Sequence, residues 1–262
     1  MNKLKIPVIR NIIRILFLGI ASYFLVSCRS AKSHEPKTAE QVFDDAMALF
    51  KNEDYQEAEK LFETIRLQYP ASQYADDAQF YLGESNFLRK EYIYAAYNYN
   101  MLRKIYPQSD YSKESLFKTG LCYYKLSPPY DRDQEYTTKA IQSFSEFKTI
   151  YPEDSLAGKA LDYIKELREK LAHREYFTAL LYNKLYSPVS ALIYFDSVID
   201  NYSDTNYYEP AMFGKIETLF SMKRNDSALS LIDLYKKLFP NGTNFAQVNL
   251  IEQSIRNGTY AK

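Results

Sequence analysis

The chain of 262 residues carries 33 basic and 33 acidic side chains, so its formal net charge is zero. This balance, without a basic stripe, argues against a nucleic-acid partner. Only two histidines and two cysteines occur, and the seven glycines form no phosphate-binding loop. The sequence therefore predicts no metal site, no cofactor and no enzyme activity. Of the two cysteines, Cys122 is predicted to be a small buried side chain rather than a reactive thiol.

The first 37 residues have the pattern of a targeting segment. Residues 1–27 begin with basic side chains, continue with an apolar run over 15–26 and end in LVS directly before Cys28. An apolar run of about 12 residues is too short to span a bilayer but suits a secretory signal peptide. The LVSC sequence resembles the bacterial lipoprotein signal, so Cys28 is the predicted lipid-attachment residue and 28–37 a lipidated tether. An ordinary signal peptide that ends near a cysteine is the alternative.

Five cassettes with the same internal spacing follow. In each, an alanine precedes an aromatic residue by eleven positions, and the residues four and seven after the alanine are apolar. These offsets place all four side chains on one face of a helix. Small residues, among them Gly83, Gly120 and Gly214, are predicted to let a preceding helix approach closely. The alanine and aromatic pairs are Ala58 with Tyr69, Ala95 with Tyr106, Ala140 with Tyr151, Ala191 with Tyr202, and Ala228 with Phe239.

Repeated helix pairs predict an all-α fold. The cleanest interval, from Tyr69 to Tyr106, is 37 residues, and the pattern resembles the tetratricopeptide repeat, whose period is about 34. The sequence thus predicts an α-solenoid of five tetratricopeptide-like helix pairs with a C-terminal capping helix and tail over 241–262. Repeats 1–3 are assigned to 38–152 and repeats 4–5 to 153–240.

Two longer intervals interrupt the period. The first contains residues 127–134, whose two prolines predict a loop. The second adds 14 residues without a proline, which is close to four helical turns and predicts one long helix from Leu156 to Tyr186. On its surface Glu166 is expected to pair with Lys170, four residues later.

A stripe of aromatic residues recurs in the first helices of repeats 1–3. Counted in the same way from Gly214, the equivalent positions Ala211 and Thr218 carry no aromatic ring. The stripe is therefore predicted to be confined to the N-terminal half and to line a concave groove for an extended, aromatic-ended peptide. Packing inside the solenoid is the alternative. The candidate groove residues are Phe43, Met47, Phe50, Phe80, Glu84, Phe87, Phe117 and Tyr124.

Residues between 131 and 182 carry a family resemblance. The matching positions are Asp131-Arg132-Asp133, the cassette from Ala140 to Pro152, and Leu167, Leu171, Ala172, Glu175, Tyr176, Ala179 and Tyr182. They resemble the BamD family, the tetratricopeptide lipoproteins of the outer-membrane β-barrel assembly machinery, and the similarity extends over about 38–240. The family implies a lipid anchor in the outer membrane, a position facing the periplasm, and recognition of unfolded outer-membrane β-barrel substrates. It also implies docking of the C-terminal repeats on the periplasmic domains of the central β-barrel assembly subunit, with other accessory lipoproteins as further candidate partners.

One departure from the family falls in repeat four. A member of the family presents a basic residue to the barrel subunit at the position of Tyr194, so that ion pair cannot be carried over, and Tyr194 is a candidate contact of another kind. The alternative is that the Tyr194 side chain packs in the solenoid core. Two other functions also stay open: a Tol-associated or peptidoglycan-related adaptor, and a glycan-binding lipoprotein of an uptake system. The latter commonly stacks sugars on tryptophan, and this chain has none.

Overall fold

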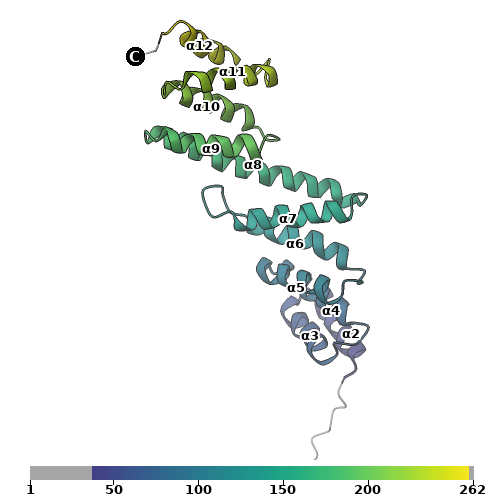
Figure 1. Ribbon diagram of the computed structural model, residues 1–262. Coiled ribbons are helices and arrows are strands. Elements are labelled where there is room, and N and C mark those ends of the chain that lie inside the picture. Colours follow the sequence, from purple (N-terminus) through teal and green to yellow (C-terminus); the bar gives the residue numbers. More distant parts are fainter. Residues whose placement is uncertain (1–36, 260–262) are drawn as a thin grey trace, which may run out of the picture.

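The computed structural model describes residues 37–259, which form helices and loops without a strand. The helices stack in chain order into an elongated solenoid, with α2 at one end and α12 at the other (Figure 1). The predicted all-α solenoid of five helix pairs and a capping helix is confirmed. The elements are α2 (Ala39–Lys51), α3 (Tyr55–Gln68), α4 (Ala75–Leu88), α5 (Tyr92–Ile105), α6 (Ser112–Leu126), α7 (Glu135–Ile150), α8 (Ser155–Lys184), α9 (Pro188–Asn201), α10 (Tyr208–Ser221), α11 (Asn225–Leu238) and α12 (Phe245–Arg256).

The second helix of each pair buries the face that the cassettes predict. In α5, for example, Ala95, Tyr99 and Leu102 have no exposed surface. Each of these helices ends where its aromatic residue becomes the C-cap, as at Tyr106. A proline that follows four of the five aromatics helps to end the helix, because it cannot supply the next backbone N–H. The core is consequently a chain of small clusters between neighbouring helices rather than one central core.

The turns between paired helices use left-handed backbone at residues other than glycine. Glu53, Lys90, Tyr186 and Lys223 have φ angles of 63°, 64°, 56° and 57°. The residue after each one donates its N–H back to the preceding helix, as Glu91 does to the carbonyl of Asn86 at 2.8 Å. This hydrogen bond satisfies a carbonyl that the end of the helix would leave open.

Three glycines allow close helix contacts, but not all in the same way. A Cβ atom at Gly83 would lie 2.5 Å from the Tyr99 ring, and one at Gly120 would lie 2.7 Å from the Phe144 ring, each in the second helix of its own pair. A Cβ atom at Gly214 would instead meet Phe195 of α9, in the preceding pair. Gly214 thus permits a close helix contact, as predicted, but with the preceding pair rather than with the second helix of its own pair.

The two interruptions of the period are where the sequence places them. The loop over 127–134 separates α6 from α7, and the Gln134 side chain closes it by donating to the carbonyls of Pro129 and Arg132 at 2.7 and 3.0 Å. The 30-residue α8 is the single long helix predicted by the 14-residue addition. Its length carries the chain from the N-terminal repeats to the C-terminal ones (Figure 1).

The expected surface pair on α8 is not formed. Glu166 accepts a hydrogen bond from the Tyr124 hydroxyl at 2.8 Å, and Lys170 donates to Ser127 Oγ at 2.8 Å. Both side chains reach the end of α6 instead of each other. Burial, the larger influence, lowers the pKa of Lys170 although Glu166 acts in the opposite direction. The pair was expected from spacing along one helix, but a neighbouring helix offers better partners.

Candidate binding surfaces

The predicted lipid-attachment residue, Cys28, lies outside the described residues. Between residues 37 and 259, no helix is both long and apolar enough to cross a membrane. The same part of the chain holds no cluster of His, Cys and acidic side chains that could bind a metal ion. Cys122 is fully buried, as predicted, and burial raises the pKa of its thiol to about 12. A thiol with so high a pKa is a weak nucleophile at neutral pH.

Two members of the aromatic stripe are core residues. Phe80 and Phe117 are only 5% and 6% exposed. The Phe80 ring stacks on Tyr111 with 4.2 Å between centroids, and the Phe117 ring meets Phe144 edge-on at 5.5 Å. The alternative of packing inside the solenoid thus describes Phe80 and Phe117, because the following helices cover their rings.

The other members of the stripe are half-buried. Each of their rings contacts another aromatic ring, and Met47 packs against the same cluster as Phe43 and Phe50. These side chains keep part of their surface accessible along the first helices of repeats 1–3. The ring contacts are Phe43 with Tyr74 at 5.0 Å, Phe50 with Tyr81 at 5.1 Å, Phe87 with Tyr92 at 5.5 Å and Tyr124 with Tyr163 at 4.6 Å.

Glu84 is the centre of a polar contact among three helices. Its carboxylate accepts hydrogen bonds from the Tyr99 hydroxyl of α5 and from Lys118 Nζ of α6, the latter at 2.5 and 2.6 Å. Lys118 Nζ also lies 5.7 Å from the ring centroids of both Phe80 and Phe87. Burial and the nearby Glu84 raise the pKa of Tyr99, so its hydroxyl stays protonated. The candidate polar residue of the groove is therefore already paired, which holds α4, α5 and α6 together.

The aromatic stripe is not confined to the N-terminal half. Because Gly214 faces the preceding pair, the residue equivalent to Gly83 in α10 is Ile216, which lies twelve positions before Ala228 as Gly83 does before Ala95. Counted from Ile216, the stripe positions are Phe213 and Phe220, and both are half-buried aromatics. The predicted confinement rested on a register that was two residues off, and it is wrong. Aromatic rings at these positions therefore also occur in the first helix of repeat five.

Tyr194 lies at the surface of the α8 and α9 pair. Its ring stacks on that of Tyr182, with 5.3 Å between centroids and 12° between planes, and it is half-buried. The adjacent Tyr182 raises the pKa of Tyr194. Tyr194 is therefore neither a core residue nor an isolated surface side chain, and its partly accessible ring remains available for a contact.

An exposed apolar ridge follows the C-terminal half of α8, and nothing in the sequence reading anticipated it. Phe177 and Leu181 of α8 and the C-cap residue Leu185 follow one another at intervals of four residues and are 44%, 53% and 62% exposed. We call these three residues the α8 ridge. Beside it, the loop residue Tyr130 and α8 enclose a groove of about 490 Å³. The sequence feature that could have indicated the α8 ridge is the length of α8, because a helix longer than its neighbour leaves part of its apolar face uncovered.

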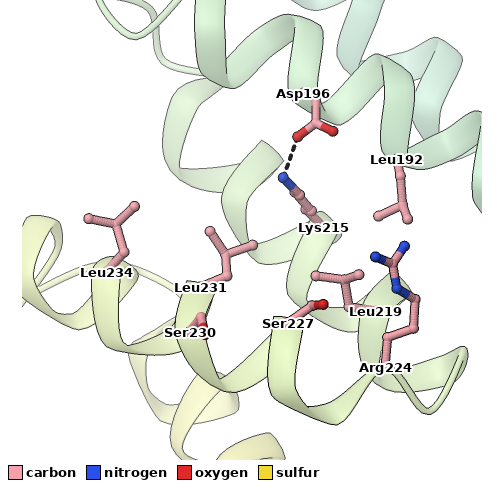
Figure 2. A pocket seen from close by; sticks show the side chains of 9 residues that line it. All are labelled: Leu192, Asp196, Lys215, Leu219, Arg224, Ser227, Ser230, Leu231 and Leu234. Carbon is pink, nitrogen blue, oxygen red and sulfur yellow. Dashed lines mark hydrogen bonds and ion pairs between the residues drawn. The ribbon is translucent and has the colours of Figure 1, made fainter.

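A second pocket, of about 540 Å³, lies between α9, α10 and α11 (Figure 2). Leucine side chains form its apolar walls, and an ion pair between Asp196 and Lys215 crosses its upper side. Arg224, at the start of α11, directs its guanidinium group toward the same space (Figure 2). Lys215 is already paired with Asp196, so Arg224 is the charged side chain of the lining that this ion pair leaves over. Its leucines are Leu192, Leu219, Leu231 and Leu234.

Comparison with known proteins points to one family. The family model named YfiO and described as an outer membrane lipoprotein matches residues 35–231. An outer membrane protein assembly factor BamD from Rickettsia prowazekii is 23% identical to this chain and covers 93% of it and 96% of its own length. Its counterpart from Caulobacter vibrioides is 21% identical, over 80% of this chain and 73% of that protein. Among solved structures, a tetratricopeptide repeat protein from Parabacteroides merdae is 15% identical, with a TM-score of 0.39 over 85% of this chain and 87% of that one.

Proposed function

Because this chain belongs to the YfiO family of outer membrane lipoproteins, we propose that it is an outer-membrane protein assembly factor that acts as a lipid-anchored scaffold. The observation that carries the proposal is the family match over 35–231. It is supported by the alignment with the assembly factor from Rickettsia prowazekii, which covers 96% of that protein. The match favours assembly over an adaptor role in a Tol-associated or glycan-uptake system. A stack of helix pairs suits this role, since it offers long surfaces to several partners at once.

The proposed anchor is a lipid on Cys28, which would hold the chain at the outer membrane with its repeats in the periplasm. We expect Cys28→Ala to abolish incorporation of labelled palmitate. Cys122→Ala is the matched control, because Cys122 is fully buried and should not affect labelling. Unchanged labelling of the Cys28→Ala protein would contradict the anchor.

The proposed partner is the central subunit of the β-barrel assembly machinery, which would dock on repeats 4 and 5. Tyr194 supports this placement, because its stacked ring is partly accessible and an aromatic ring buries a large area on contact. We expect Tyr194→Ala to reduce the amount of this barrel subunit that co-purifies in mild detergent. Tyr97→Ala is the control, since Tyr97 is 57% exposed on α5 in the N-terminal repeats. Equal losses for the two variants would argue against docking through repeat four.

The proposed substrates are unfolded outer-membrane β-barrel proteins, which would bind along repeats 1–3. Support comes from the half-buried members of the stripe, because aromatic and methionine side chains accept varied peptide sequences. We expect Phe87→Ser to weaken binding of a labelled peptide from a barrel protein's C-terminal end by about fivefold or more. Phe220→Ser, at the same repeat position in α10, is the matched control. If both variants lose the same affinity, the N-terminal repeats are not the binding surface.

A further inference from the structure

The α8 ridge continues a helix face that another helix covers further toward the N-terminus. Leu167 lies on this face, has no exposed surface and packs in the same cluster as Phe144 and Phe147 of α7. Leu181 comes 14 residues later, which is about four turns, so it lies on nearly the same side of α8. Yet Leu181 is 53% exposed, because α7 has 16 residues and α8 has 30. The ridge is thus a helix-packing face whose covering helix is absent from residues 37–259.

The loop over 127–134 gives this face a fixed border. The Tyr130 ring lies 4.1 Å from the His173 ring and 6.2 Å from the Phe177 ring, centroid to centroid. The groove of about 490 Å³ runs between this loop and α8. Its border is held in place by the contacts of Gln134 with the loop carbonyls, so the groove is preformed rather than dependent on a partner.

The charges along the groove favour an acidic occupant. Arg174 and Lys184 both line it, and no ion pair between residues 37 and 259 involves either of them. Asp131 is the acidic residue in the lining, so the positive charges outnumber the negative. Arg174 and Lys184 are ten residues apart, or about 15 Å along the helix axis. Acidic groups with a similar separation on a partner would meet both.

We propose that the α8 ridge binds an amphipathic α-helix of a partner protein, which carries an apolar stripe and acidic side chains about ten residues apart. This helix packs on the C-terminal half of α8 in the way that α7 packs on its N-terminal half. Its apolar stripe packs on Phe177, Leu181 and Leu185, and its acidic side chains pair with Arg174 and Lys184. The site is separate from the contact proposed at Tyr194, because Tyr182, on which Tyr194 stacks, points about 100° away from Leu181 around the helix.

Two synthetic helical peptides of about six turns test this proposal. Both carry the same leucine stripe; one has glutamate and the other lysine beside it, about ten residues apart. With the full-length protein in mild detergent, the glutamate peptide should bind at least about tenfold more tightly than the lysine peptide. Leu181→Glu should weaken its binding by about tenfold or more, and Leu185→Glu serves as an independent second variant. Leu234→Glu is the control, since Leu234 is 46% exposed on α11.

The charge requirement has its own test. The double variant Arg174→Glu with Lys184→Glu should reverse the preference, so that the lysine peptide binds more tightly. Absence of binding, or equal binding of both peptides, would overturn the proposal. It would also be overturned if sedimentation shows a dimer of the wild-type chain that Leu181→Glu dissociates, or if phosphatidylcholine vesicles adsorb the wild type but not this variant. Tyr194→Ala should leave peptide binding unchanged, so failure of the proposed docking at Tyr194 is distinguishable from failure at the ridge.

Discussion

The aromatic stripe of α4 and α6 and the α8 ridge both follow the spacing of one helix face, but Phe80 and Phe117 are 5% and 6% exposed whereas Leu181 is 53% exposed. The helices on either side explain the difference. In the N-terminal repeats neighbouring helices are of similar length, and the rings of Phe80 and Phe117 are covered by residues of the helices that follow them. The second half of α8 extends beyond α7 and has no such cover. Helical periodicity shows which side chains share a face of a helix. The length of the neighbouring helix determines whether that face is buried in the core or exposed at the surface.

The largest expected effect tests this difference directly. Replacing Phe80 with alanine should lower the free energy of unfolding by about 3–5 kcal/mol, because it leaves a cavity beside Tyr111 and Tyr99. The matched change Phe177→Ala should cost less than about 1 kcal/mol, since its ring is already 44% exposed. Chemical denaturation followed by circular dichroism measures both. Similar losses would mean that the ridge is as well covered as the stripe.

A second prediction uses two glycines that lie inside helices. Gly83→Ala should destabilise the protein by about 1–3 kcal/mol, because its Cβ would lie 2.5 Å from the buried Tyr99 ring. Gly158→Ala in α8 should instead stabilise it by up to about 1 kcal/mol, since nothing lies within 4 Å of that Cβ and alanine is the better helix former. Thermal unfolding of the two variants would show shifts of opposite sign. A stabilising Gly83→Ala would disprove the close contact between α4 and α5.

Most of the fold could be predicted because its signals are local. The cassette spacing, the prolines of the 127–134 loop and the length of α8 all depend on residues near each other in sequence. Contacts between elements were harder to predict. Glu166 and Lys170 have the right spacing for a pair, but Glu166 bonds Tyr124 of α6 and Lys170 bonds Ser127 at the end of α6 instead. Gly214 likewise lies only two residues from the position equivalent to Gly83, but it faces α9 rather than α11.

The candidate surfaces were less predictable than the fold for a related reason. An aromatic residue on a helix face can line a groove or fill a core, and the sequence left both alternatives open for Phe80. In the structure Phe80 is a core residue, because the Tyr111 ring covers its ring. The α8 ridge could not be predicted for the opposite reason. The 14 additional residues preserve an apolar face that looks like core, and nothing in the local sequence shows that α7 ends before it covers that face. Cys28 lies outside the described residues and stays a prediction.

The capping helix at the C-terminal end of the solenoid carries a charged contact whose contribution to stability should depend on pH. Besides the buried Val248 and Ile255, α12 contacts α11 through Glu252, which accepts hydrogen bonds from Lys236 of α11 and from Arg256 of its own helix. These partners lower the pKa of Glu252 below its usual 4.5. A carboxyl group with a lowered pKa stabilises the folded state above its usual pKa, and this stabilisation is lost as the pH falls through the lowered value.

Glu252→Gln should therefore cost about 0.5–1 kcal/mol near pH 7, and the difference from the wild type should shrink toward about pH 3. Denaturation at several pH values measures this difference. Glu153→Gln is the control, because Glu153 is exposed and forms no ion pair with any residue from 37 to 259. A loss that does not change with pH would show that the charge of Glu252 is not what attaches α12.

The smallest expected effect concerns the turns that all helix pairs but the third share. Lys90 has a φ of 64°, a conformation in which any Cβ is strained, so Lys90→Gly should stabilise the protein by about 1 kcal/mol or less. The same exchange at Lys159, an exposed position inside α8, should destabilise it by about 1 kcal/mol, because glycine is a poor helix former. Thermal unfolding should give shifts of opposite sign for these two identical chemical changes. If both variants are destabilised, the turn tolerates lysine at this φ angle without strain.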